Sequence, residues 1–390
     1  MPDDLSSKHD NAGGDRPAGA ADAATGTLET TARAPGDERR RGRVFQDLTT
    51  GNIPKKLFLQ AWPQAVDNML LIVDQMVDLV WAARLPQGFR AVAGIGVAQT
   101  VVQIGQTARS GLDQSLRAMV SRAVGARNIP LANHIVLQAF TVSVVYSVLL
   151  IILGEIFAEF LMRIVGGGGV GIQSQAVNYM RVWLITVSLL GMRQVGTSAL
   201  QASSDVMTPL RAVLVTRVVH IAMSPFLMFG WWWFPSMGVS GAAMANALGW
   251  MAGNVIIYYA LFKGNARLRI TFRGYRFDRK LMWQMIKIGA PASVVGSERA
   301  ISQLVLLHVA AAFGEVALAA YSIVRRTENL LNFGSMGVAQ ASGVMVGQSL
   351  GAGIPQRARK AVLWGLLYVN LIPAIVRLFL IFAPTIFSMF

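Results

Sequence analysis

The chain contains no cysteine, which excludes disulfide bonds, thiolate metal sites and a cysteine nucleophile. Charged residues are also scarce, at 14% of 390 residues, whereas apolar residues make up 54% even without glycine. A soluble domain has about 45–50% apolar residues with glycine included. Apolar runs of about 20 residues, the length that a membrane-spanning helix requires, recur along the chain. The composition therefore predicts an all-α polytopic membrane protein.

The net charge of +15 is not spread evenly along the chain. Residues 1–50 hold nine acids and seven bases, whereas residues 51–390 hold 28 bases and 11 acids. The densest basic cluster, residues 263–280, lies between two apolar runs and lacks the aromatic and glycine pattern of an RNA-binding strand. We interpret it as a cytoplasmic loop that obeys the positive-inside rule, and not as a nucleic-acid site. The same rule places the N-terminus in the cytoplasm. We expect the protein to be integral to the plasma membrane, which is the inner membrane of a bacterium.

Apolar periodicity and loop residues predict nine spans and a tail before them. The spans lie roughly at residues 57–83, 91–121, 131–153, 176–200, 209–231, 239–262, 284–312, 316–346 and 361–384. Residues 1–50 are rich in Ala, Gly, Asp and Thr and lack an apolar core, so they predict a disordered cytoplasmic tail.

The sequence contains an internal repeat. Residues 118–126 (AMVSRAVGA) align with residues 344–352 (VMVGQSLGA) at an offset of 226, and Pro63 aligns with Pro291 at an offset of 228. Spans one to three therefore recur as spans seven to nine, in the same orientation because six spans separate the two starts. Such parallel repeats predict two lobes related by an axis along the membrane normal. We expect a complete six-helix N-lobe at residues 51–262 and a three-helix partial C-lobe at residues 281–390. A fragment and a natural truncation both explain the missing half-lobe.

Several motifs of this sequence resemble those of the multidrug and toxic compound extrusion (MATE) family of antiporters. They are Pro63 followed by Val77-Asp78, AVAG at 91–94, SRAVGARN at 121–128, NYMR at 178–181, SDVMTP at 204–209, MGVSGAAMANAL at 237–248, LAAYSIVRRTE at 318–328 and VGQSLGAG at 346–353. The resemblance implies two six-helix lobes around a V-shaped cavity, of which this chain lacks the last three helices. It also implies export of organic cations in exchange for protons or sodium.

Three acids lie on one face of the first span. Helical spacing places Asp67, Asp74 and Asp78 within about 40° of one another. An aspartate at the middle of a membrane costs about 2.5–3.5 kcal/mol, so the stripe needs a solvated or paired environment. We expect it to face an aqueous cavity of the N-lobe, although a purely structural polar groove is the alternative. Asp78 matches the first-helix aspartate of the family, and the resemblance therefore implies that it binds the coupling proton or a sodium ion.

The remaining candidate residues lie on three other spans. His220 and Ser224 stand where the family often has an asparagine and an aspartate, so His220 is either a proton relay or a packing residue. Arg109 and Asp113 are four residues apart, as are Asp113 and Arg117, which predicts a charge ladder along one helix. A gating ion pair from Arg109 to Asp74 or Asp78 is the alternative. Glu298 lies one position from a functional glutamate of some family members.

We therefore predict a secondary transporter that exports organic cations or drugs by alternating access. It is expected to act as a monomer, to use no cofactor besides the coupling proton or sodium ion, and to be no enzyme. A lipid-linked sugar flippase needs a basic cavity, and Arg109 and Arg117 keep that alternative open. A transport-inactive membrane scaffold is a further alternative. An intramembrane metalloenzyme is disfavoured because the four histidines, His9, His134, His220 and His308, form no HExxH motif.

Overall fold

The computed structural model describes residues 47–85, 88–165, 170–233, 235–263, 267–273, 275–313 and 315–387. All of them belong to one structural unit, Phe45–Phe390. Within these ranges the regular elements are helices, which confirms the predicted all-α class. The predicted tail lies outside the described residues up to residue 46.

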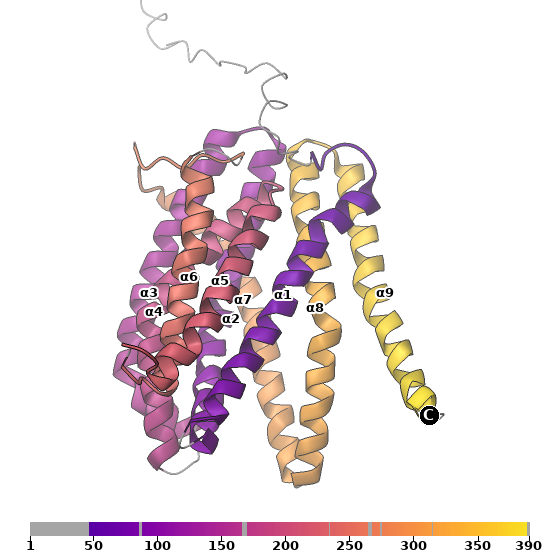
Figure 1. Cartoon of the computed structure of the whole chain (residues 1–390). Coiled ribbons are helices and arrows are strands. Elements are labelled where there is room, and N and C mark those ends of the chain that lie inside the picture. Colours follow the sequence, from indigo (N-terminus) through magenta and orange to yellow (C-terminus); the bar gives the residue numbers. More distant parts are fainter. Residues whose placement is uncertain are drawn as a thin grey trace, which may run out of the picture. The chain divides into compact units, whose positions relative to one another are not determined.

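The described residues form nine helices, and each helix contains or overlaps one predicted span (Figure 1). They are α1 (Ile53–Ala83), α2 (Gly88–Gly125), α3 (Ile129–Val165), α4 (Val170–Ala202), α5 (Met207–Phe229), α6 (Val239–Phe262), α7 (Arg279–Ala312), α8 (Glu315–Gly351) and α9 (Pro355–Phe387). Most helices extend beyond the apolar run. α7, for example, begins with Arg279 and Lys280, because charged residues continue a helix outside the apolar part of a membrane.

Composition alone identifies only some of these helices as membrane spans. Within the described ranges, the segments Ile129–Phe157, Met207–Phe229 and Pro355–Ile375 are both long and apolar enough to cross a bilayer. Other helices are long enough but carry charges, such as Asp74 and Asp78 of α1 and Arg109 of α2, all three of which are buried. A helical bundle accommodates such residues in its interior, where they pair with one another.

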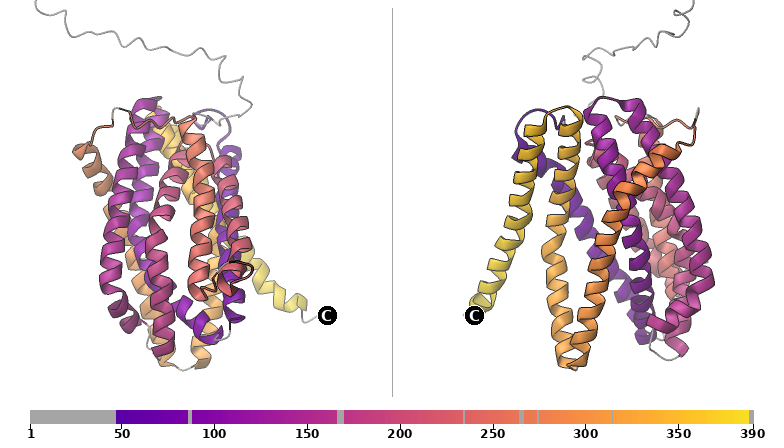
Figure 2. Two further views of the ribbon diagram at one scale, coloured as in Figure 1. Left: turned by 60° about the vertical axis from the view of Figure 1, so that its left-hand side comes forward. Right: turned by 180° about the vertical axis from the view of Figure 1, so that it is seen from behind.

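α1 connects the two copies of the repeat. It packs against α5 on one side and α8 on the other, and Figure 1 shows it running obliquely between them. α2 packs against both α7 and α8, which are visible beside it from behind in Figure 2. The pairs α1·α8 and α7·α2 are equivalent under the repeat, so the two copies contact each other with approximate twofold symmetry.

Glycine contacts between α2 and α8 confirm the offset of 226 residues. A Cβ atom at Gly125 would lie 2.1 Å from the carbonyl oxygen of Gln348, and a Cβ atom at Gly351 would lie 2.1 Å from that of Arg122. Gly125 corresponds to Gly351 in the repeat, and Arg122 corresponds to Gln348. Each contact is thus the symmetry mate of the other. Only glycine permits two backbones to approach so closely.

The turn before α1 is held against α9. Leu48 is fully buried among residues of α1, α8 and α9. The guanidinium of Arg357 donates hydrogen bonds to the carbonyl oxygens of Leu48, Thr50 and Gly51 at 2.8, 2.6 and 2.9 Å. The tail predicted for residues 1–50 therefore ends earlier than expected, because residues 47–50 are packed and hydrogen-bonded.

The turn before α5 fixes the helix that carries the predicted histidine. The Asp205 carboxylate accepts hydrogen bonds from the backbone N–H and the hydroxyl of Thr208, at 3.1 and 2.8 Å. These contacts satisfy a donor at the start of α5, as capping residues do. α6, rich in small residues from Val239 onward, packs closely along α5.

Candidate functional site

Asp74 and Asp78 lie one turn apart on α1 and face α5. Their exposed fractions are 3% and 4%, so both carboxylates are removed from bulk solvent. Burying a carboxylate without a partner costs several kcal/mol, and each of the two has partners on α5. Asp67 is only half-buried and lies within electrostatic reach of Arg193 on α4. The predicted stripe thus divides into a buried pair and a third, more exposed acid, and Arg193 lies within electrostatic reach of both Asp67 and Asp74.

Asp74 is held by two cationic or basic groups of α5. Its Oδ2 forms an ion pair with the guanidinium of Arg217. Its Oδ1 lies 2.6 Å from Nδ1 of His220. Arg217 and His220 are three residues apart and therefore share a face of α5.

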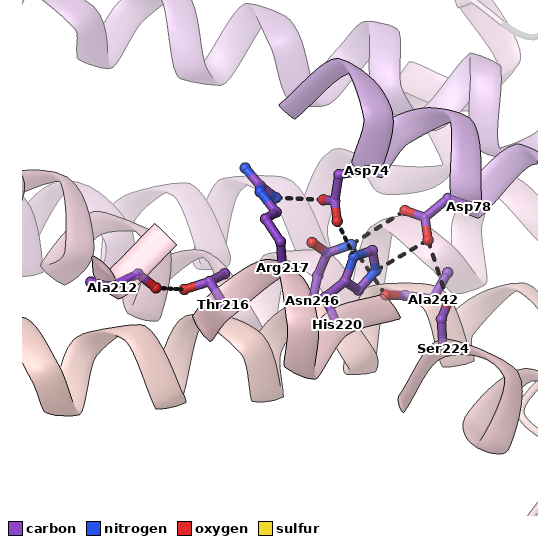
Figure 3. A network of polar contacts seen from close by, with 9 residues as sticks. All are labelled: Asp74, Asp78, Ala212, Thr216, Arg217, His220, Ser224, Ala242 and Asn246. Carbon is purple, nitrogen blue, oxygen red and sulfur yellow. Dashed lines mark hydrogen bonds and ion pairs between the residues drawn. The ribbon is translucent and has the colours of Figure 1, made fainter. Parts of the chain in front are cut away.

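Asp78 has weaker partners on α5 and α6 (Figure 3). Its Oδ1 lies 3.1 Å from Nε2 of His220 and accepts a hydrogen bond of 3.4 Å from the hydroxyl of Ser224. Its Oδ2 accepts a hydrogen bond of 3.4 Å from the amide of Asn246 on α6. Ser224 and Asn246 are neutral, so His220 is the group in this set that can bring a positive charge to Asp78.

His220 lies between the two carboxylates, and its side chain is fully buried. A protonated imidazole has a donor on each ring nitrogen. It contacts Asp74 through a hydrogen bond at Nδ1 and Asp78 through an ion-pair distance at Nε2. In that state two anions face two cations, Arg217 and His220, and the cluster is neutral. A neutral imidazole presents a lone pair to one of the carboxylates, which is repulsive unless that carboxylate is itself protonated. The geometry therefore favours a protonated His220 between two ionised aspartates, or a neutral His220 beside one protonated aspartate.

Arg109 and Asp113 belong to a second polar cluster on α2. The Arg109 guanidinium donates to Gln194 at 2.6 Å, to Ser143 at 2.8 Å and to the carbonyl oxygen of Gly191 at 2.8 Å. It lies 3.5 Å from Asp113, as expected for the predicted ladder. These contacts join α2 to α3 and α4, and they do not include Asp74 or Asp78.

The chain matches a known protein family over most of its length. A family model described as MatE matches residues 63–226 and 291–390. The chain belongs to the MATE family of transporters. Among curated MATE relatives, it is 24% identical over 352 residues to the probable multidrug resistance protein YoeA of Bacillus subtilis, covering 89% of this chain and 75% of the relative. It is also 24% identical over 324 residues to a protein of Shewanella oneidensis named FAD transporter, covering 83% of this chain and 71% of that protein.

Solved MATE structures share the fold. One described as MATE in the bent conformation has a TM-score of 0.79 and 22% identity, covering 87% of this chain and 75% of the other. An outward-facing MATE family transporter has a TM-score of 0.78 and 22% identity, with the same coverage. The predicted family and polytopic helical fold are thus confirmed, and the family and fold are those of integral membrane transporters, which are not enzymes.

Glu298 on α7 is exposed and is not part of the Asp74–His220–Asp78 cluster. In the described part of the chain, no group of three or more His, Cys, Asp or Glu residues is arranged to hold a metal ion. Sodium binding at Asp78 stays a prediction.

Two members of the cluster were not predicted from the sequence. Arg217 lies inside the apolar α5 and shares a face with His220 and Ser224, at spacings of three and seven residues. A charge within a span, three residues from the only histidine of that span, was the available signal. Asn246 gave a weaker signal, because an asparagine among alanines also fits simple helix packing.

Proposed function

We propose that the chain exports organic cations in exchange for protons, and that the buried cluster of Asp74, Asp78, Arg217 and His220 holds the coupling proton. The observation that carries this proposal is the position of His220, at 2.6 Å from Asp74 and 3.1 Å from Asp78. Gain or loss of one proton at His220 or Asp78 changes whether the imidazole and the carboxylates attract or repel each other. The cluster is therefore suited to convert protonation into movement of α1 against α5.

The two aspartates have different roles in this proposal. Asp74 forms an ion pair with Arg217, whose charge is permanent, so Asp74 stays ionised as a fixed anchor. Asp78 has neutral partners in Ser224 and Asn246, both at 3.4 Å. Asp78 and His220 are consequently the pair that exchanges the proton.

The surroundings of the carboxylates favour a proton over a sodium ion as the coupling ion. A hard metal cation prefers a shell of oxygen ligands. Both oxygens of Asp74 already face nitrogen groups of Arg217 and His220. At Asp78 the nearest of the described partners is also a nitrogen, Nε2 of His220 at 3.1 Å. A sodium ion at either carboxylate would have to displace His220, whereas a proton needs only a lone pair.

Protonation reaches the rest of the transporter through α1. This helix packs against α5 and also against α8, in the second copy of the repeat. Protonation of Asp78 removes its attraction to a protonated His220 and loosens α1 from α5. α1 also packs on α8, so a movement of α1 is transmitted to the second copy of the repeat. If the proton binds one conformation of the transporter more tightly than the other, protonation shifts the equilibrium toward that conformation.

An organic cation is the first candidate substrate, because it competes with a proton for the negative charge of Asp78. The relative named as a probable multidrug resistance protein supports this class. An anionic substrate is the second candidate. The Nε atoms of Arg193 and Arg217 are buried and have no hydrogen-bond partner among the described residues, and another relative is named FAD transporter.

We further propose that the protein acts as a monomer in a bacterial inner membrane with its N-terminus in the cytoplasm. The basic segment from Lys263 to Lys280 supports this orientation, because positive loops are retained on the cytoplasmic side. A reporter fused to the N-terminus that is active only in the cytoplasm tests the orientation.

Transport by the chain in proteoliposomes tests the proposed function. A fluorescent organic cation and a flavin nucleotide are offered separately, each under an imposed proton gradient or sodium gradient. We expect movement of the cation with the proton gradient and its loss in Asp78→Asn. Asp67→Asn makes the same chemical change on α1 outside the cluster and serves as the control. Transport driven by sodium alone, or equal loss in both variants, would overturn the proposal, and selective transport of the flavin would establish the second substrate class.

A further inference from the structure

A groove lies at the beginning of α7 and does not involve the proton cluster. It has a volume of about 760 Å³ and is lined by Phe277, Arg279, Lys280, Met282, Trp283 and Ile286. Four of the lining side chains are apolar and the other two are cations. The groove therefore combines an apolar wall with a positive rim.

The apolar wall is exposed although its side chains are large. Phe277, Trp283 and Ile286 have exposed fractions of 59%, 65% and 45%. On the opposite face of the same helical turns, Leu281 and Met285 are buried in the core formed with α2 and α3. The packed face thus fixes the orientation of α7. The groove lies on the opposite, exposed face of the helix.

The repeat shows that this open face is directed away from neighbouring helices. At the offset of 228 residues, Leu281 and Met285 correspond to Ile53 and Leu57, which are also buried. Trp283 and Ile286 correspond to Lys55 and Phe58, which are both exposed. The first copy, α1–α3, is followed by three further helices, α4–α6, and this face of α1 is still not covered. In a membrane protein, such an apolar face contacts lipid.

The two cations of the groove have no acidic partner in the described part of the chain. Neither Arg279 nor Lys280 forms an ion pair with a described carboxylate. The adjacent acid, Asp278, instead accepts hydrogen bonds from the backbone N–H groups of Lys280 and Leu281, each at 3.0 Å. The N–H group of Leu281 makes the largest contribution to holding the pKa of Asp278 below its usual value, so this acid stays ionised as a helix cap.

We propose that this groove binds an anionic phospholipid, with the phosphate at Arg279 and Lys280 and an acyl chain along Phe277, Trp283 and Ile286. An amphiphile with a negative head group matches both parts of the groove. A soluble anion would leave the apolar wall in contact with water. Basic side chains beside a membrane helix attract acidic lipids, and tryptophan favours the membrane interface. This site is independent of the substrate and of the coupling ion.

Quenching of Trp283 fluorescence tests the proposal. The full chain is placed in nanodiscs that contain phosphatidylglycerol or phosphatidylcholine with brominated acyl chains, each diluted into unlabelled lipid. The contribution of Trp283 is the difference between the wild type and Trp283→Phe. We expect half-quenching at a much lower fraction of phosphatidylglycerol than of phosphatidylcholine. Replacing Arg279 and Lys280 by Gln should weaken phosphatidylglycerol binding about fivefold for each cation.

A matched variant distinguishes the groove from general charge attraction. Arg269→Gln with Arg273→Gln removes two charges from the same basic segment, but neither residue lines the groove. This pair should leave the quenching of Trp283 by phosphatidylglycerol unchanged. Equal quenching by the two lipids, or equal loss in both double variants, would overturn the proposal. Absence of quenching by either lipid would also overturn it and would indicate that a segment of protein occupies the groove.

Discussion

The Nε2 atom of His220 lies 3.1 Å from Oδ1 of Asp78, while Nδ1 of the same ring lies 2.6 Å from Asp74. One histidine on α5 therefore joins two consecutive turns of α1. Because Arg217 also binds Asp74, the two carboxylates differ in how firmly their charge is fixed. This difference is the physical basis for assigning proton exchange to Asp78 and His220.

Replacing His220 by Gln should uncouple transport from protons. Glutamine keeps a hydrogen-bonding side chain but has no proton to exchange, so Asp78 loses its cationic partner. We expect substrate movement that no longer follows an imposed pH gradient, with membrane insertion unchanged. Transport rates measured across a series of pH values test this. A variant that keeps the pH dependence of the wild type would contradict it.

Removing the fixed charge at Asp74 should mainly reduce stability. Asp74→Asn leaves Arg217 buried without its anion, and breaking a buried pair in this way costs about 3–5 kcal/mol. Arg217→Gln should cost a similar amount. The double variant should regain part of the loss, because neither charge is then left alone. Thermal unfolding in detergent measures all three, and strictly additive losses would show that the pair does not interact.

The glycine contacts between α2 and α8 should control how closely the two copies of the repeat approach. In Gly125→Ala the new methyl group would lie 2.1 Å from the carbonyl oxygen of Gln348, so the helices must separate at this end. Gly351→Ala should act in the same way, because its contact is the symmetry mate. Gly343→Ala on α8 is the control, since a Cβ there meets nothing within 4 Å.

The separation of the helices can be measured with spin labels, and the absence of cysteine from the sequence means that labels attach only at introduced cysteines. Spin labels at Ala126→Cys and Gln356→Cys report the distance between the ends of α2 and α9 without a background thiol. A longer distance distribution is expected for Gly125→Ala and Gly351→Ala but not for Gly343→Ala. An unchanged distribution in the first two would mean that the helices tolerate the methyl group by another shift.

Arg109 should matter for stability but not for proton coupling. Its guanidinium joins Gln194, Ser143 and the Gly191 carbonyl oxygen, and a lysine cannot reach all three. Each lost charge-assisted hydrogen bond costs about 1.5–3 kcal/mol. Arg109→Lys should therefore lower the unfolding temperature while transport keeps its pH dependence. A changed pH dependence would assign Arg109 to the coupling machinery.

The helices and the repeat could be predicted from the sequence because both depend on local patterns. Apolar runs located nine helices, and the offsets of 226 and 228 match the symmetric contacts of Gly125 and Gly351 and the matching burial of Ile53 and Leu281. Helix ends were less predictable, because residues such as Arg279 extend a helix without adding to its apolar run. The packed turn at Leu48 was missed because its burial depends on α8 and α9, far away in the sequence.

The candidate site was predictable in part. Helical spacing grouped Asp74 with Asp78, and the family resemblance pointed to His220 and Ser224. The sequence could not show which cation pairs with Asp74, because α2 and α5 each carry an arginine, Arg109 and Arg217, that could form the ion pair. That choice depends on how α1 is rotated against α5 and α2, which no local pattern specifies. Asp67 lies on the same face of α1 as Asp74, and both are within electrostatic reach of Arg193. Asp74 additionally pairs with Arg217 and His220 on α5, because α1 has different neighbours along its length.

The protonation state of the His220 ring can be measured directly. Nitrogen-15 NMR of the chain with labelled histidine distinguishes an imidazole with two N–H groups from one with a single N–H, and subtraction of the His220→Gln spectrum assigns the signal among the four histidines. Two N–H groups at neutral pH are predicted in the wild type, with a shift toward one N–H in Asp78→Asn. A neutral ring that is insensitive to pH and to Asp78→Asn would contradict proton exchange at this site.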